Sequence, residues 1–195
     1  MKNKTNTVVI VSVVVLLSLA LFSCATGALS KSEKAQQQDS VRHMANKALA
    51  DLFKKHPAAQ DTIAKAPGFA VFSDFGFKMM FLGGAEGSGV AENRARGQEI
   101  FMKMAEFQPG LGLGADTFRL VFIFETLDAF DNFVTSGWEA GANAMAIAKT
   151  KTAGGGVAGA VTVSEGVKMV QLNEEGAIVG VSLTAAKYYR DKDLN

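Results

Sequence analysis

The most strand-like stretch of this sequence is Phe118-Arg119-Leu120-Val121-Phe122-Ile123-Phe124-Glu125. Successive side chains of a β-strand point to opposite faces of the sheet, so the phenylalanines at even positions share one face. The other face carries Arg119, Val121 and Ile123, and it is also largely apolar towards the end of the run. A strand that is apolar on both faces is buried on both, which predicts a central position in a sheet.

Shorter apolar runs with turn residues between them extend this sheet on both sides. Breaks are expected at Asp74-Phe75-Gly76 and Pro109-Gly110, a polar turn at 93–97, and a hairpin turn at 173–176. The expected strands are 69–73, 77–82, a short one near Val90, 98–107, 111–125, 157–164, 167–172 and 177–184.

Three segments have the spacing of helices instead. Apolar residues at intervals of three and four predict a helix from Ser40, its N-cap, to His56, before Pro57. A short helix is expected over 58–66, and another over 127–135 after the N-cap residue Thr126. The expected fold is α+β: a single compact domain, mostly antiparallel β-sheet or a partly closed barrel, with an N-terminal amphipathic helix and one mid-chain helix.

The first 23 residues have the proportions of an export signal. Lys2 and Lys4 precede an apolar run from Val8 to Phe22, which is short for a permanent membrane span. The run ends in Leu21-Phe22-Ser23-Cys24, which resembles the lipobox of bacterial lipoproteins. We therefore expect a signal peptide at 1–23, an acylated Cys24, a flexible tether at 24–39 and a domain at 40–195. An N-terminal transmembrane helix is the alternative.

The charge balance and the single cysteine narrow the class of protein. The chain has 20 Lys plus Arg and 19 Asp plus Glu, and loss of Lys2 and Lys4 leaves 18 against 19. A nearly neutral chain gives no argument for a nucleic-acid partner. Cys24 is the only cysteine, so no intramolecular disulfide can form. By resemblance to lipoprotein sorting signals, Ala25 after the cysteine favours an outer membrane location facing the periplasm.

No motif predicts catalysis, a metal or a cofactor. The glycines at 83–89 lack the Gly-Lys-Ser/Thr ending of a P-loop, and those at 110–114 precede a strand rather than a helix. His43 and His56 lie 13 positions apart without a carboxylate at ligand spacing. We therefore expect no enzyme, no catalytic residues, no metal and no cofactor.

The basic face of the first helix is the candidate binding surface. Arg42, Lys47, Lys54 and Lys55 lie opposite its apolar face and could contact anionic lipid headgroups. The alternative is a helix whose apolar face packs on its own sheet. Residues 188–192, with two tyrosines, an arginine and a lysine, could add to the membrane contact or form a solvated end.

Several stretches in order resemble the SYLF family. They are 66–72 (APGFAVF), 83–90 (GGAEGSGV), 111–116 (LGLGAD), 122–130 (FIFETLDAF) and 141–148 (GANAMAIA). Ser73 stands where the family usually has proline, and 185–189 (AAKYY) replaces Gly-Gly-Gln of many bacterial members. The resemblance implies a compact sheet-rich domain, without known catalysis, that binds phosphoinositide or other anionic lipid.

These observations together predict a membrane-anchored lipoprotein whose domain binds lipid without catalysis. Its partners would be its own acyl chains and a bound anionic lipid, with no protein partner specified. Two alternatives stay open: a structural or protein-interaction module of the cell envelope, and a carrier that holds a hydrophobic ligand between Phe77–Phe81 and Phe118–Phe124.

Overall fold

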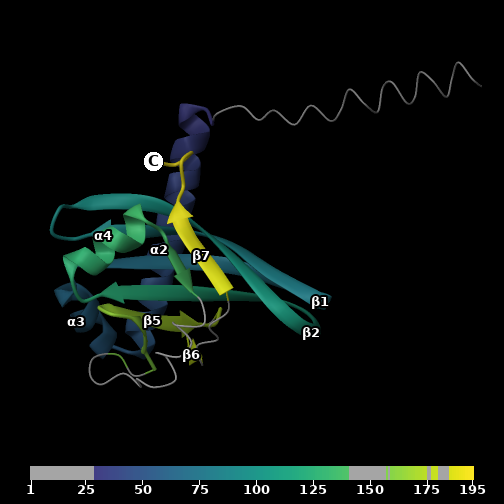
Figure 1. Ribbon diagram of the computed structural model, residues 1–195. Coiled ribbons are helices and arrows are strands. Elements are labelled where there is room, and N and C mark those ends of the chain that lie inside the picture. The colour runs from purple at the N-terminus through teal and green to yellow at the C-terminus, as the bar shows by residue number, and fades with distance from the viewer. Residues whose placement is uncertain (1–28, 141–156, 158, 175–176, 180–184) are drawn as a thin grey trace, which may run out of the picture. The chain divides into compact units, whose positions relative to one another are not determined.

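A long antiparallel hairpin, β1 with β2, forms the centre of the computed structural model (Figure 1). The structure describes residues 29–140, 157, 159–174, 177–179 and 185–195, and only the backbone of 74–83, 85, 107–116, 140, 179 and 185. Its elements are α2 (Lys31–Lys55), α3 (Ala58–Lys65), β1 (Gly68–Asn93), β2 (Gln98–Phe124), α4 (Leu127–Thr135), β3 (Trp138–Ala140), β4 (Val161–Ser164), β5 (Val167–Leu172), β6 (Ile178–Val179) and β7 (Ala185–Arg190).

The described strands form one antiparallel seven-stranded sheet. β2 pairs with β1, β5 and β7, while β3 extends the sheet beyond β7, and β4 and β6 pair with β5. The sheet curls into a half-barrel (Figure 1). The α+β class, the antiparallel sheet, the partly closed barrel and the central place of residues 118–124 are therefore confirmed.

The expected breaks at 74–76 and 109–110 are wrong, because β1 and β2 each run through them. Gly76 pairs with Asp116 in regular register, and Pro109 pairs with Leu82. The register shifts by one residue between Met80 and Leu82. A bulge leaves one residue outside the ladder, and proline, which has no N–H to donate, is tolerated beside such an irregularity.

The hairpin also folds back on itself, which brings the two ends of β1 together. The backbone N–H of Arg94 donates to the carbonyl of Pro67 at 3.0 Å. Gly89 lies so close to the start of the strand that a Cβ there would be 2.4 Å from Phe72 Cδ1 and 2.5 Å from the Val71 carbonyl oxygen. Glycine is therefore required at position 89 for this close approach of backbone to side chain.

The helices cover opposite faces of the sheet (Figure 1). On the α4 side, rings from β1, β2, α4, β3 and β7 pack with centroids 5.0–6.2 Å apart, and Phe122 and Phe133 are fully buried among them. On the other side, α2 packs against β1 through the buried stripe Val41, Ala45, Ala48 and Leu52. The stripe confirms the amphipathic helix and shows that its apolar face packs on the sheet.

The first helix begins nine residues before the expected N-cap, Ser40. Residues 31–39, expected to be part of a tether, are the first turns of α2. Most of them are lysine, glutamate, alanine or glutamine, which are strong helix formers. The Lys34 ammonium donates to the Asn195 carbonyl at 2.8 Å, and the Gln38 side-chain amide donates to the Leu194 carbonyl at 2.7 Å. The tether prediction is therefore wrong for 31–39.

The C-terminal segment is part of the sheet rather than a solvated end. Residues 185–190 form β7, between β2 and β3, and Tyr188 is buried in the aromatic core. The turn at 93–97 and the helices α3 and α4 are confirmed, and so is the antiparallel pairing of β5 with β6 on either side of the turn expected at 173–176, of which residues 175–176 lie outside the described part. The strand expected from 157 begins at Val161, and residues 180–184 lie outside the described part of the chain.

Candidate functional site

The four basic residues predicted to bind headgroups lie along α2, but they have different surroundings. Arg42 is held on three sides: Nε donates to Glu99 at 2.9 Å, Nη1 donates to Asp39 at 2.8 Å, and the guanidinium carbon lies 5.1 Å from the Phe101 ring centroid. The hydrogen bond to Glu99, followed by that to Asp39, raises the pKa of Arg42 despite partial desolvation. Arg42 therefore joins α2 to β2.

Lys47 is also in an ion pair. Its ammonium donates to Asp51 at 2.8 Å, one turn along the helix. The same carboxylate oxygen accepts a hydrogen bond from Arg119 Nη1 at 2.8 Å. The hydrogen bond from Lys47, and next that from Arg119, lowers the pKa of Asp51 to about 2. Lys47 is exposed, but its charge is compensated.

Lys54 and Lys55 form the remaining half of the predicted set. Both are exposed at the C-terminal end of α2. Within the described parts of the chain, neither ammonium forms an ion pair or a hydrogen bond. The structure thus divides the predicted set into two paired cations and two adjacent free lysines.

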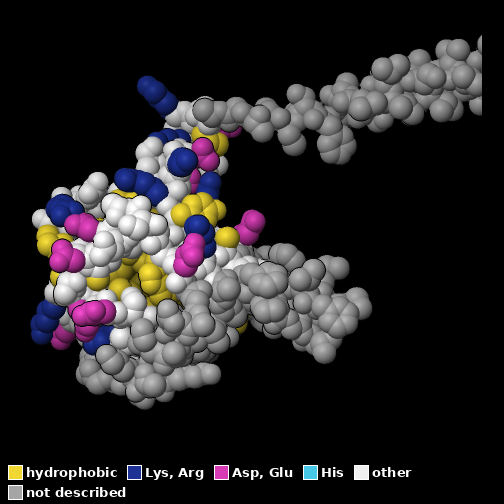
Figure 2. Space-filling view, in the orientation of Figure 1, with side chains coloured by type: hydrophobic (Ala, Val, Ile, Leu, Met, Phe, Trp, Pro, Cys, Tyr) yellow, Lys and Arg dark blue, Asp and Glu magenta, His cyan; other side chains and the backbone are white. Residues whose placement is uncertain are grey.

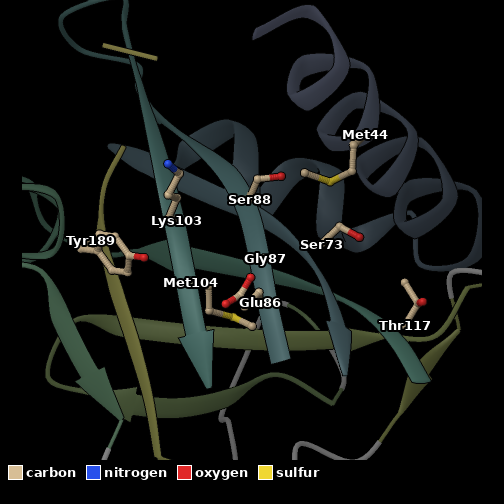
Figure 3. Close-up of a pocket in the computed structure, with 9 residues that line it drawn as sticks. All are labelled: Met44, Ser73, Glu86, Gly87, Ser88, Lys103, Met104, Thr117 and Tyr189. Atoms are coloured by element: carbon tan, nitrogen blue, oxygen red, sulfur yellow. The ribbon is translucent and has the colours of Figure 1, made fainter. Parts of the chain in front are cut away.

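A groove of about 650 Å³ opens between α2 and the strands (Figure 3). Its lining is mostly hydroxyl groups, methionines and one exposed aromatic ring: Met44, Ser73, Glu86, Gly87, Ser88, Lys103, Met104, Thr117 and Tyr189. Ser88 pairs with Lys103 in the β1–β2 ladder, and a serine nucleophile with a lysine base would need these two side chains within hydrogen-bonding reach of each other.

Lys103 cannot serve as that base in this structure. Its ammonium lies 3.3 Å from both Asp191 and Asp193. Burial alone would lower the pKa of Lys103, but the hydrogen bonds and charges of the two aspartates outweigh it and raise the pKa above its usual value. The residue therefore stays protonated and joins β2 to the segment after β7.

A second groove, of about 760 Å³, lies where α2, the β1–β2 turn and the end of β7 meet. Three arginines line it, Arg42, Arg96 and Arg190. Sequence reasoning included Arg42 and noted Arg190, but it missed Arg96 entirely. Because the three residues lie up to 148 positions apart in the sequence, only the folded hairpin brings them together.

The other chemical features behave as structural elements. Gly84, Gly87 and Gly89 lie within β1, so no helix follows the glycine cluster. His43 is exposed and His56 half-buried, and no group of three His, Cys, Asp or Glu side chains is placed to hold a metal among the described residues. Phe122 and Phe124 of the suggested ligand carrier are core residues, while the side chains of 77–81 lie outside the described set.

The surface charges follow the near-neutral balance of the sequence. On the face in Figure 2, basic and acidic side chains are interspersed rather than gathered into one large patch. Cys24 and the expected signal at 1–23 lie outside the described residues. Among the helices in the described part, none has the length and apolar character needed to cross a bilayer.

Comparison with known proteins shows a similarity over part of a bacterial protein. The chain is 34% identical, over 154 residues, to Beta cell expansion factor A of Aeromonas veronii. The aligned region covers 79% of this chain and 57% of that protein, so the chain spans little more than half the length of the curated relative that it matches. No protein-family model matches the sequence.

Proposed function

We propose that this protein is a lipoprotein of the bacterial envelope, anchored through Cys24 in the outer membrane and facing the periplasm, whose domain binds anionic lipid without catalysis. The observation that carries the proposal is the pair Lys54 and Lys55, adjacent and exposed at the end of α2, with no ion pair to any described residue. A basic residue near an anionic membrane surface contributes about 1 kcal/mol to binding.

The packing of α2 determines how such a contact is made. Its apolar stripe is buried on β1, so the helix has no apolar face to insert between acyl chains. The contact proposed is therefore electrostatic, between the lysines and the headgroups. Arg42 and Lys47, both predicted from the sequence to take part, are engaged by carboxylates and contribute less.

The anchor and the lysines together limit the orientation of the helix. Lys54 comes 23 residues after Lys31, which is about 35 Å along a helix axis. Because Cys24 precedes Lys31 by seven residues, acyl chains at Cys24 hold the beginning of α2 close to the bilayer. Simultaneous contact at Lys54 then favours an orientation in which α2 lies along the membrane surface rather than upright on it.

The name of the Aeromonas relative describes an effect on beta cells and no chemical activity. The proposal therefore takes its support from the described surface and from the SYLF-like motifs, which imply binding of anionic lipid. Two alternatives were left open by the sequence: an envelope module that contacts protein, and a carrier of a hydrophobic ligand. Among the described residues, no comparable observation supports either of them.

The test compares two double variants of the chain from Ala25 onward, which keeps every described residue. Lys54→Glu/Lys55→Glu reverses the proposed contact. Lys31→Glu/Lys192→Glu is the matched control, since both lysines are exposed and form no ion pair among the described residues. Each variant is sedimented with vesicles rich in phosphatidylglycerol, and with vesicles of phosphatidylcholine alone.

We expect the first variant to reduce binding to the anionic vesicles about tenfold or more, since two favourable contacts become repulsive. The control should bind within about threefold of the unaltered chain, because the tested chain has no acyl anchor to hold the start of α2 at the vesicle and neither residue belongs to the proposed contact. Equal losses in both variants would show that only net charge matters and would reject the site. Unchanged binding in both would reject the proposal for α2 altogether.

A further inference from the structure

The arginine-lined groove has the features of a binding site that was not part of the predicted set. Arg42 comes from α2, Arg96 from the turn after β1, and Arg190 from the last residue of β7. Gathering three like charges costs free energy unless something compensates them. Carboxylates compensate two of the three, which leaves the guanidinium of Arg190 without an ion pair among the described residues.

The two arginines that pair with carboxylates are held in place, but not all of their N–H donors are engaged. Arg42 uses two of its N–H donors, on Glu99 and Asp39, and lies over the Phe101 ring. Arg96 donates to both oxygens of Asp131, at 2.8 and 2.9 Å, in a two-point contact. A guanidinium has five N–H donors, so each keeps three for a ligand. Their positions are therefore set before any ligand arrives.

The mouth of the groove leaves room for an anion. Gly97 lines it in a left-handed conformation with φ +59°, and a Cβ there would meet nothing within 4 Å. Gln98, which follows it, is exposed and presents an amide side chain to the same space. The groove volume of about 760 Å³ exceeds that of one small anion, so the groove also has room for the molecule that carries the anion.

We infer that this groove binds a phosphate monoester, with Arg190 as the principal contact and Arg42 and Arg96 as fixed donors beside it. Planar guanidinium groups match phosphate oxygens in two-point hydrogen bonds, and a monoester offers three acceptor oxygens at the end of its carrier. The carrier is a lipid headgroup or a soluble phosphorylated sugar or polyol. The site is separate from Lys54 and Lys55, so this inference does not depend on the proposal made for those two lysines.

The probe is glycerol 3-phosphate, titrated into the chain from Ala25 onward. Amide chemical shifts of Gly97 and Gln98 report on the groove, and calorimetry gives the affinity. Arg190→Gln removes the uncompensated guanidinium. Lys192→Gln is its matched control, because it removes one exposed cation two residues away that does not line the groove. Vesicles that contain phosphatidic acid form a second arm.

We expect saturable shifts at Gly97 and Gln98, and about a tenfold or greater loss of affinity in Arg190→Gln against less than twofold in Lys192→Gln. Binding of glycerol 3-phosphate without binding to the vesicles identifies a soluble ligand. Arg190-dependent binding in both arms identifies a lipid headgroup. Equal losses in the two variants would overturn the inference. The absence of a saturable shift in the unaltered chain would also overturn it, and that result does not depend on whether Arg190→Gln folds.

Discussion

At the scale of single residues, Arg119 joins three parts of the chain that the sequence shows as separate. It lies in β2, and its buried guanidinium donates to Asp51 of α2 and to the carbonyls of Asn173 and Glu174, in the turn after β5. The alternation in 118–125 correctly placed Arg119 on the face away from the phenylalanines. It could not name the partners, because they are set by the packing of α2 and not by local pattern.

Replacing Arg119 should therefore be costly. Arg119→Ala leaves two carbonyls without their donor and a carboxylate without its buried partner, and we expect a loss of about 2–4 kcal/mol in the free energy of unfolding. Lys47→Ala is the control, since Lys47 contacts the same carboxylate but is exposed; it should cost about 1 kcal/mol or less. Urea denaturation measures both, and similar losses would contradict the role given to Arg119.

The lowered pKa of Asp51 predicts how the stability of the fold depends on pH. Its pKa falls from an ordinary 3.8 to about 2 in the folded protein, so the unfolded chain takes up a proton first as the pH falls. The stabilisation is complete above about pH 4 and is lost as the pH falls through about 2. The stability difference between the unaltered chain and Asp51→Asn should shrink from pH 6 towards pH 2; a difference that does not change with pH would contradict the assignment.

At the scale of elements, local signals succeeded where local chemistry decides the boundary. Thr126 was predicted to cap α4, and its hydroxyl accepts the Ala129 N–H at 3.1 Å. The breaks at Pro109 and Gly76 failed because cross-strand pairing over the whole hairpin overrides one unfavourable residue. The start of α2 did have a sequence signal: Ser30, three residues before Glu33, matches the capping-box pattern.

The folded-back hairpin depends on one glycine. Gly89→Ala places a methyl group against Phe72 and the Val71 carbonyl, and we expect a loss of about 2–3 kcal/mol in the free energy of unfolding. Gly97→Ala, where the methyl group meets open space but the backbone is left-handed, should cost about 1–2 kcal/mol. Thermal or urea unfolding separates the two, and an equal or smaller cost at Gly89 would contradict the close approach of the two ends of β1.

At the scale of the whole molecule, the last residues hold distant parts of the chain together. The side chain of Asn195 accepts from the Phe101 N–H at 3.1 Å and donates to the Phe101 carbonyl at 2.7 Å, while Lys34 donates to the Asn195 carbonyl. Asn195→Ala should reduce stability by about 1–2 kcal/mol and increase hydrogen exchange at Phe101. Unchanged exchange there would contradict the contact. Asp191, which is buried, should keep the rest of the segment in place.

The packing of separate elements also determines how much of the candidate sites could be predicted from the sequence. The sequence predicted a basic face on α2, and Lys54 and Lys55 are exposed on it, without an ion pair among the described residues. The pair Lys47–Asp51, one turn apart on α2, could have been predicted from its spacing, but the pair Arg42–Glu99 could not, because Glu99 comes from another element. The arginine groove was beyond sequence reasoning for the same reason.

Attachment through Cys24 is the claim on which the proposed membrane role depends, and intact mass analysis of the protein extracted from native membranes tests it most directly. We predict a polypeptide that begins at Cys24 and carries the added mass of acyl chains, which would be released by treatments that cleave ester-linked fatty acids. A chain that still begins at Met1, or one with an unmodified Cys24 thiol, would contradict it.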